Sequence, residues 1–408
     1  MTAPGGAADS LHALLTPETV RSRAHRLLRL GLDGELPHFT LELERLGDAV
    51  ALVLQVTREH YPDLVVPPHS RWRHFELAGR DLWRDLAATV PDLAGAARAR
   101  VRFDLAVVSV LLDAGAGDRW RYRDAVTGQT FARSEGLAVA SLRLFACGGC
   151  STDDAAPLQA DADGLATLDA VALARAFQVD AGNPLTGLDA RARLLNSLGA
   201  ALRQQGDGAT RPALLFDRLA ARAHNGTLPA REILLAVLAL MNGIWPHGLT
   251  VDGLALGDVG RHRALASDDA TSELVPFHKL SQWLSYSLVE PLQEAGIAVT
   301  DLDQLTGLAE YRNGGLFMDT GVLVPRDPAL SAQPLRPDHE AVVEWRALTV
   351  ALLDRLADAV RADLKRDSAS LPLAAILQGG TWTAGRRLAG TLRGGLPPLS
   401  IDSDGTVF

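Results

Sequence analysis

The stretch LVPFHKLSQWLSYSL, residues 274–288, predicts a helix and raises the question of function. On a helical wheel, one side gathers apolar residues that are expected to enter a core, namely Phe277, Leu280, Leu284 and Leu288. The other side gathers polar and aromatic residues, namely Lys279, Gln282, Trp283, Tyr286 and Glu290. Such a stripe is usually solvated. The alternative is that it forms the wall of a binding site.

Two details favour the wall of a site. Trp283 and Tyr286 are poor choices for a bare solvent face in a chain with only 7 Trp and 4 Tyr. Ser281 and Ser285 are small, so a neighbouring element can pack closely against the helix. His278 lies between the two faces, where a lone histidine is more often a packed, hydrogen-bonded residue than a ligand.

Composition predicts a mainly α fold. The chain has 408 residues, 47% of them hydrophobic and only 5% aromatic, and it is rich in Leu and Ala, which favour helix over strand. We expect a disordered tail at 1–10 and then one compact helical domain at 11–408, with possible sub-domains at 11–150 and 151–408. Small β-hairpins are expected with turns at Thr127-Gly128 and at Asp404-Gly405. No parallel sheet of more than about three strands is expected.

Charge and cysteine content exclude several classes of protein. A net charge of −9 argues against a nucleic-acid or anionic-membrane binder. The start of the chain lacks a signal-peptide pattern, and the apolar run at 233–241 is too short for a bilayer, so we expect a soluble cytoplasmic protein. Cys147 and Cys150 form a CxxC without a second pair, and HExxH is absent, so no metal and no cofactor are expected. The sequence leaves the oligomeric state open.

EYRNGG, residues 310–315, is the second candidate for a site. It places a carboxylate, a phenol, a guanidinium and an amide before two glycines, which let the backbone approach a ligand or end a helix. The alternative is a capped helix end with an exposed pair of Glu310 and Arg312.

Three further segments contribute candidate residues. In LLDAGAG, residues 111–117, backbone amides can meet an anion beside Asp113, although a glycine-rich helix stop is the alternative. GGTWTAGRR, residues 379–387, predicts a helix start followed by Arg386 and Arg387, which suits a phosphate. Asp319 is a further candidate for substrate binding. Neither nucleotide-binding glycine fingerprint is present.

At LVPFHKLSQWLSYSLVEPL and LTGLAEYRNGGLFMDTGVL the sequence resembles the uracil-catabolism proteins of bacteria and fungi. VVSVLLDAGAG, RSEGLAVASLRLF, NPLTGLDARARLL, GTWTAGR and the final SDGTVF carry the same resemblance, which therefore covers nearly the whole chain. It implies a role in the route that opens the pyrimidine ring on the nucleotide and leaves a ureido-ribose. Some members of that family carry a uracil phosphoribosyltransferase label.

A more distant similarity links the two candidate stretches. The queuosine-salvage N-glycosidases, which are helical and similar to helix-hairpin-helix DNA glycosylases, have an aromatic-x-Lys helix and an acid-Tyr-Arg segment about 30 residues later. Phe277-His278-Lys279 resembles the first and Glu310-Tyr311-Arg312 the second. In that family the lysine and the acid line the ribosyl site. This chain differs in having Glu where Asp is usual, and Asn-Gly-Gly after the arginine.

The resemblance implies a separate role for each of the candidate residues. Glu310 would stabilise an oxocarbenium-like ribose and act as general base, and Lys279, within salt-bridge range, would orient it or donate a proton to the leaving group. The residues expected to contact substrate are Phe277, His278, Gln282, Trp283, Tyr286, Tyr311, Arg312, Asn313, Asp113 and Asp319. Arg386 or Arg387 would bind a phosphate.

The expected activity is hydrolysis of the N-glycosidic bond of a ring-opened pyrimidine ribonucleotide or of ribosylurea, either free or as the 5-phosphate. One alternative is a phosphoribosyltransferase, since SDDATSE (267–273) faintly resembles an acidic phosphoribose loop. That loop should follow a hydrophobic parallel strand. The other alternative is a non-catalytic protein that binds pyrimidine catabolites. The expected partner in each case is a small molecule.

Overall fold

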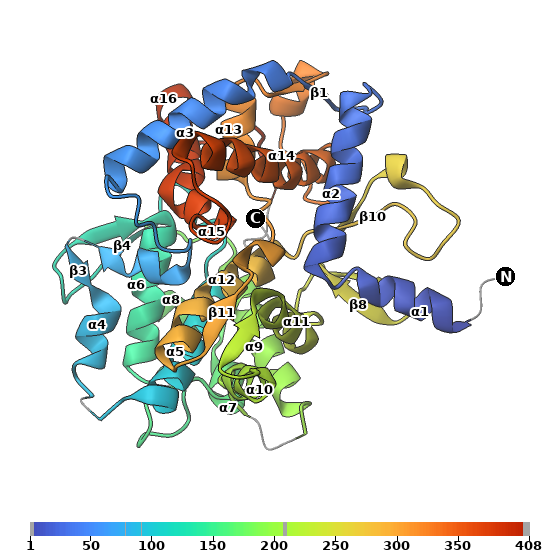
Figure 1. Cartoon of the computed structure of the whole chain (residues 1–408). Helices are drawn as coiled ribbons and strands as arrows, with labels where there is room; N and C mark the ends of the chain where they lie inside the picture. Colours follow the sequence, from blue (N-terminus) through green and yellow to red (C-terminus); the bar gives the residue numbers. More distant parts are fainter. Residues whose placement is uncertain (1–3, 78, 91, 207–209, 403–408) are drawn as a thin grey trace. The chain divides into compact units, whose positions relative to one another are not determined.

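The computed structural model describes residues 4–77, 79–90, 92–206 and 210–402, and these form a mainly helical protein (Figure 1). Every strand among these residues belongs to a two-stranded pair. The pair of β6 (Thr227–Pro229) and β11 (Ala298–Thr300) is parallel, and the others are antiparallel. The predicted fold class, a helical body with small hairpins, is confirmed.

The chain divides into two units whose segments alternate along the sequence. Unit 1 comprises the described residues of Met1–His69, Leu249–Gln282 and Asp301–Asp402. Unit 2 comprises those of Ser70–Gly248 and Trp283–Thr300. The helix α12 (Lys279–Glu294) therefore contributes its first four residues to unit 1 and the rest to unit 2.

Unit 1 is built on long amphipathic helices. Its further helices are α1 (Pro4–Ala13), α2 (Pro17–Leu32), α3 (Leu46–His60), α13 (Tyr311–Asp319), α14 (Glu340–Leu364), α15 (Leu373–Ile376) and α16 (Trp382–Arg393). Its strand pairs are β1 (Phe39–Leu41) with β12 (Leu323–Pro325), β7 (Leu249–Val251) with β8 (Leu254–Gly257), and β9 (Val259–Arg261) with β10 (Leu274–Pro276). α14 is buried over most of its length and packs against α2, α3 and α13.

Unit 2 has shorter helices and three small strand pairs. Its further helices are α4 (Leu82–Ala87), α5 (Gly95–Leu111), α6 (Arg133–Ala146), α7 (Ala162–Thr167), α8 (Ala170–Ala176), α9 (Leu188–Arg203), α10 (Leu214–Arg222) and α11 (Ala230–Met241). Besides β6 with β11, its pairs are β2 (Glu76–Leu77) with β3 (Arg80–Asp81), and β4 (Arg121–Arg123) with β5 (Thr130–Ala132). The expected hairpin with a turn at Gly128 is this last pair, and Gly128 has a φ of 70°.

The ends of the chain differ from expectation or lie outside the described residues. Helix α1 begins at Pro4, where the sequence predicts a disordered tail. Leu11 and Leu14 explain the difference, since both are buried in an apolar cluster with Leu256 and Leu274. The hairpin expected at Asp404-Gly405 lies outside the described residues. None of the helices in the described ranges is long and apolar enough to cross a membrane.

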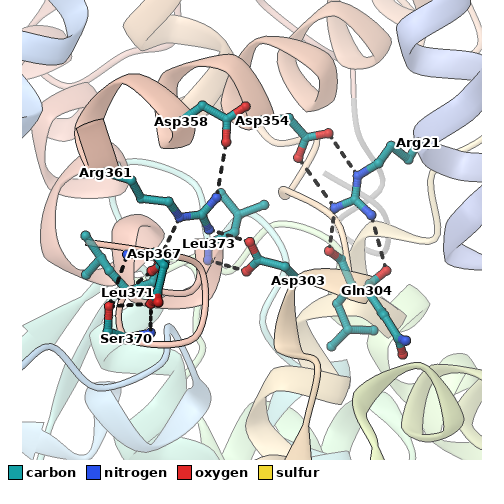
Figure 2. Close-up of polar contacts among 11 residues, drawn as sticks. Arg21, Asp303, Gln304, Asp354, Asp358, Arg361, Asp367, Ser370, Leu371 and Leu373 are labelled. Carbon is teal, nitrogen blue, oxygen red and sulfur yellow. Dashed lines mark hydrogen bonds and ion pairs between the residues drawn. The ribbon is translucent and has the colours of Figure 1, made fainter. Parts of the chain in front are cut away.

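A network of arginines and aspartates in unit 1 fixes the segment that leads to Glu310 (Figure 2). Asp303 is paired with Arg361 of α14 and accepts a 2.7 Å hydrogen bond from the Leu373 amide. Arg21 of α2 binds Asp354 of α14 at 2.9 Å and donates to the carbonyls of Gln304 and Leu305 at 3.4 and 2.8 Å. Residues 303–305 are therefore tied to three helices, α2, α14 and α15, just before the candidate site.

Candidate functional site

Glu310 is the N-cap of α13, and its side chain is buried. One carboxylate oxygen accepts the Asn313 amide at 2.7 Å, and the other accepts the Arg312 amide at 2.6 Å. Burial raises the pKa of Glu310, while these two hydrogen bonds and the charges of Lys279 and Arg312 act in the opposite direction. The net effect is a carboxyl group that takes up a proton more readily than an exposed glutamate.

EYRNGG begins a helix instead of ending one, and its glycines lie inside α13. A Cβ on Gly314 would lie 2.6 Å from the indole of Trp345, so the glycine lets α13 approach α14 closely. The expected exposed pair of Glu310 and Arg312 is wrong, because both side chains are buried and Glu310 accepts the backbone amide of Arg312. Glu310 caps the start of α13, whereas the expected cap was at a helix end.

Asp258 and Arg346 brace both candidate catalytic residues, and the sequence analysis missed both. The Arg346 guanidinium donates two hydrogen bonds to Asp258, at 2.7 and 2.8 Å. Asp258 in turn accepts the Lys279 amide at 2.9 Å, and Arg346 donates to the Ala309 carbonyl at 3.3 Å. Although burial alone would raise the pKa of Asp258, the charge and hydrogen bonds of Arg346 hold it below its usual value. The brace thus joins the start of α12 to the residue before Glu310.

Lys279 lies near enough to Glu310 for its positive charge to lower the Glu310 pKa. Direct contact of the two side chains within salt-bridge range remains a prediction. A signal for Lys279 is present in the sequence: the chain has 40 Lys and Arg residues, and Lys279 and Lys365 are its only lysines. Almost every other permanently cationic side chain of the protein is therefore an arginine. An ammonium, whose pKa shifts more readily than that of a guanidinium, is placed beside this acid.

Phe277 and His278 are packed side chains at the turn before α12. The Arg346 guanidinium carbon lies 4.0 Å from the centroid of the Phe277 ring. His278 has a φ of 49°, and its Nε2 lies 2.9 Å from the Leu14 carbonyl oxygen. Burial lowers the pKa of His278, which favours the neutral ring. These contacts position the start of the helix, and substrate contact by either residue remains a prediction.

Gln282 and Asn313 carry buried polar atoms that lack a partner among the described residues. The Gln282 carbonyl oxygen accepts the Thr306 amide at 3.3 Å, and the Asn313 side-chain amide donates to the Leu308 carbonyl at 3.3 Å. This leaves Gln282 Nε2 and Asn313 Oδ1 unsatisfied, together with the indole nitrogen of Trp345. These three atoms, two donors and one acceptor, form a set that suits sugar hydroxyls.

The remaining polar residues of α13 are engaged with neighbouring groups. The Arg312 guanidinium carbon lies 4.7 Å from the centroid of the Tyr311 ring, and its Nη1 donates to the Gly395 carbonyl at 3.4 Å. Asp319 accepts two hydrogen bonds from Arg393, at 2.7 and 2.6 Å. Asp319 therefore ties the end of α13 to the end of α16.

Trp283, Tyr286 and Asp113 belong to unit 2, where all three are buried. With Gln282 also buried, the polar stripe of α12 is not a solvated face. The Arg71 guanidinium carbon lies 5.6 Å from the Trp283 ring centroid, and the His74 ring meets the same indole edge-on at 5.6 Å. Asp113 is paired with Arg71. The expectation that Trp283 and Tyr286 line a substrate pocket remains a prediction.

The helix start expected at GGTWTAGRR is not observed. α15 continues through a π-helical turn at Leu377–Thr381 into α16, so no helix amino terminus precedes Arg386 and Arg387. The Arg386 guanidinium carbon lies 5.3 Å from the Trp382 ring centroid, and Arg387 binds Glu59 at 2.5 Å. Phosphate binding by these arginines stays a prediction that rests on their charge alone.

Other candidate chemistries receive little support from their surroundings. Both cysteines are free thiols, and burial raises the pKa of Cys150, which disfavours a reactive thiolate. Within the described ranges, no group of three or more His, Cys, Asp or Glu side chains is placed to hold a metal. SDDATSE follows a 3₁₀ turn (Arg263–Leu265) instead of a parallel strand, and Asp269 accepts the Thr271 amide at 2.7 Å.

Comparison with known sequences places the whole chain in one group of proteins. Residues 13–408 match the family described as "Protein of unknown function (DUF1688)". Protein urg3 of Schizosaccharomyces pombe is 37% identical over 412 residues, covering 98% of this chain and 99% of that protein. Uracil catabolism protein 4 of Lachancea kluyveri is 37% identical over 417 residues, covering 92% of this chain and 93% of that protein.

Proposed function

This chain belongs to the DUF1688 family, and from that premise we propose that it is an N-ribosyl hydrolase of uracil catabolism. The proposed substrate is ribosylurea, free or as the 5-phosphate, or a ring-opened pyrimidine ribonucleotide. The pathway comes from the printed name of the relative in Lachancea kluyveri. The reaction comes from the chemistry of Glu310 and its neighbours.

The observation that carries the proposal is the state of the Glu310 carboxyl group. It is buried, its pKa is raised, and its two oxygens are fixed by backbone amides at 2.6 and 2.7 Å. A desolvated carboxylate of fixed orientation stabilises a developing positive charge more strongly than one in water. A raised pKa also brings a general base closer to neutral pH, where proton transfer from water is most effective.

The proposed reaction breaks the bond between the anomeric carbon and the ureido nitrogen. As positive charge develops on the ribose, Glu310 stabilises it and accepts a proton from the attacking water. The water oxygen bonds to the anomeric carbon, and the departing nitrogen takes up a proton for which Lys279 is the proposed donor. For ribosylurea the products are ribose and urea, with any phosphate retained on the ribose.

The buried polar atoms around Glu310 give the ribose a means of recognition. The two unsatisfied donors of Gln282 and Trp345 and the unsatisfied acceptor of Asn313 complement hydroxyl groups, each of which donates and accepts. Leaving such atoms unpaired costs free energy in the absence of a ligand. Arg386 or Arg387 would hold the 5-phosphate where one is present.

The test is incubation of the purified protein with ribosylurea, ribosylurea 5-phosphate and a ring-opened pyrimidine ribonucleotide, with free urea or ureido product and free ribose measured separately. The proposal expects both products in equal amounts from at least one substrate. Product formed only when pyrophosphate is added would favour a phosphoribosyltransferase instead. Tight binding of a substrate without turnover at any pH would favour a non-catalytic binding protein.

A further inference from the structure

The ion pair of Arg71 and Asp113 in unit 2 differs from three other Arg–Asp pairs among the described residues in the number of hydrogen bonds that join the two side chains. Arg346 with Asp258, Arg393 with Asp319 and Arg143 with Asp124 each share two hydrogen bonds, using two nitrogens and two oxygens. Arg71 instead bonds Asp113 through Nη1 and Oδ2 alone. A buried guanidinium and carboxylate normally form the two-bond arrangement, since it satisfies more of their polar atoms.

The remaining contacts of Arg71 leave one side of its guanidinium unused. Its Nε donates to Ser109 at 2.6 Å, and Ser109 is in turn 2.6 Å from Ser141, so this side belongs to a closed network. Nη2 has no hydrogen-bond partner among the described residues, although Arg71 is fully buried. A buried N–H without an acceptor is costly, and native proteins rarely leave one without a reason.

Asp113 offers the matching acceptor. It lies two residues after the end of α5, is 7% exposed, and uses only Oδ2 toward Arg71. Among the described residues, Arg71 Nη2 is therefore a donor without an acceptor, and Asp113 Oδ1 is an acceptor that takes no part in the ion pair. The Trp283 ring, with its centroid 5.6 Å from the Arg71 guanidinium carbon, supplies a flat apolar surface nearby.

We propose that Arg71 and Asp113 form a recognition site in unit 2 for the amide edge of a ureide, with Trp283 as its flat neighbour. The carbonyl oxygen of the ligand accepts from Arg71 Nη2, and the adjacent N–H of the ligand donates to Asp113 Oδ1. Uracil and ribosylurea both carry such a –CO–NH– edge. The choice of a ureide among amide ligands rests on the proposed function, whereas the donor and acceptor pattern does not.

Calorimetric titration of the full chain with uracil, ribosylurea and 1,3-dimethyluracil tests this site. Dimethyluracil keeps the carbonyls of uracil but has no N–H, so it serves as a matched ligand without the donor. The wild-type protein should bind uracil or ribosylurea at least about tenfold more tightly than dimethyluracil, because the buried acceptor is otherwise left unpaired. Tighter binding of uracil would identify the closed ring as the ligand, and tighter binding of ribosylurea would identify the open ureido group. Equal binding of dimethyluracil, or no ureide binding, would overturn the inference without any variant.

Asp113→Asn supplies a second test, and the same substitution at Asp124 is its control. An asparagine that keeps its oxygen toward Arg71 presents an NH₂ to the N–H of the ligand, so ureide affinity should fall about tenfold or more. Asp124→Asn alters another buried ion pair of unit 2 and should leave ureide affinity unchanged. Wild-type affinity in Asp113→Asn would contradict the assignment.

Glu310→Gln separates this inference from the proposed function. The variant should bind ureides as the wild type does while losing turnover. If it kept full turnover, the hydrolase mechanism would fall, but a loss of binding in Asp113→Asn would still support the site. Conversely, an inactive Glu310→Gln together with normal binding by Asp113→Asn would leave the hydrolase and remove the ureide site.

Discussion

Two opposing effects act on the charge of the Glu310 carboxyl group. As the N-cap of α13 it lies where the helix dipole and two amide donors favour a negative charge. Its burial favours the neutral form, and burial is the larger effect on its pKa. The raised pKa makes the carboxylate a stronger base than an exposed glutamate, while the two amide donors and the charge of Lys279 favour its charged form.

The pH dependence of activity should report this balance. Because the folded-state pKa of Glu310 is raised above its ordinary value of 4.5, the charged base is lost at a higher pH than for an exposed glutamate. We expect kcat/KM to fall as pH decreases through a point above 4.5. A pH profile of the wild-type enzyme measures this limb directly. Full activity retained down to pH 4.5 would contradict the assignment of Glu310 as the base.

Lys279→Met should shift the acid-side loss of activity to a still higher pH. The positive charge of Lys279 lowers the Glu310 pKa, so its removal raises that pKa and makes the base protonate at a still higher pH. Lys365→Met is the matched control, since Lys365 is the other lysine of the chain and is exposed at the end of α14. The two pH profiles should differ. Identical limbs in both variants would show that Lys279 has no electrostatic influence on the base.

At the scale of elements, α13 is held in place by close approach to its neighbours. A Cβ on Gly314 would clash with Trp345 of α14, and a Cβ on Gly385 of α16 would clash with the Arg312 carbonyl of α13. Because Glu310 caps α13, packing that shifts this helix also shifts the candidate base. The orientation of the carboxyl group therefore depends on two glycines that carry no chemistry of their own.

Gly385→Ala should destabilise the protein and reduce turnover. The added methyl overlaps backbone atoms of α13, and overpacking of this kind costs about 1–3 kcal/mol. Gly390→Ala, in the same helix, meets nothing within 4 Å and should be neutral or stabilise by up to about 1 kcal/mol. Denaturant unfolding and turnover measured on both variants check the prediction. Equal stability of the two variants would mean that α13 and α16 are not in this close contact.

The sequence predicts the helices of the candidate site better than their boundaries. The apolar positions of α12 form a local pattern, and this helix forms as expected. The glycines of EYRNGG predict either close approach of the backbone to a ligand or the end of a helix, because glycine is common beyond helix ends. The two glycines instead serve contacts with Trp345 and Pro398, which are distant in sequence and leave no local pattern.

The braces around the site could not be predicted for the same reason. Asp258 lies in a turn-rich segment and Arg346 lies inside a long helix, so neither position indicates that they share two hydrogen bonds. Nor does the sequence show that GGT at 379–381 continues a helix as a π turn. By contrast, the scarcity of lysine can be read from the sequence without any coordinates, and it narrows the candidate ammonium groups to Lys279 and Lys365.

For the molecule as a whole, Asp104 should make stability depend on pH in an unusual direction. Burial raises its pKa from 3.8 to about 6, so between these values the unfolded state has lost a proton that the folded state keeps. Unfolding then releases a proton, and stability falls as pH rises through this window. The melting temperature of the wild type should accordingly fall relative to that of Asp104→Asn between pH 4 and 6.

Asp124→Asn is the control for this measurement. The hydrogen bonds and charge of Arg143 and the Thr127 contacts outweigh burial and hold the Asp124 pKa at about 2, so folded Asp124 stays charged from pH 4 to 6, and the unfolded state, with a pKa of 3.8, is already mostly charged there. The difference between the wild type and Asp124→Asn should therefore stay flat between pH 4 and 6. A flat difference for Asp104→Asn as well would show that Asp104 is ionised normally in the folded state.

The most direct test of the central claim is the turnover of Glu310→Gln on the ribosyl substrate. The amide keeps an oxygen that can cap α13, but it carries no charge and cannot take a proton from water. We predict that release of ribose falls by roughly 10²-fold or more, while the melting temperature and substrate affinity change little. Turnover and melting temperature should be measured on the same preparation. A stable Glu310→Gln protein with undiminished release of ribose would contradict the account, because Glu310 would then be only a helix cap.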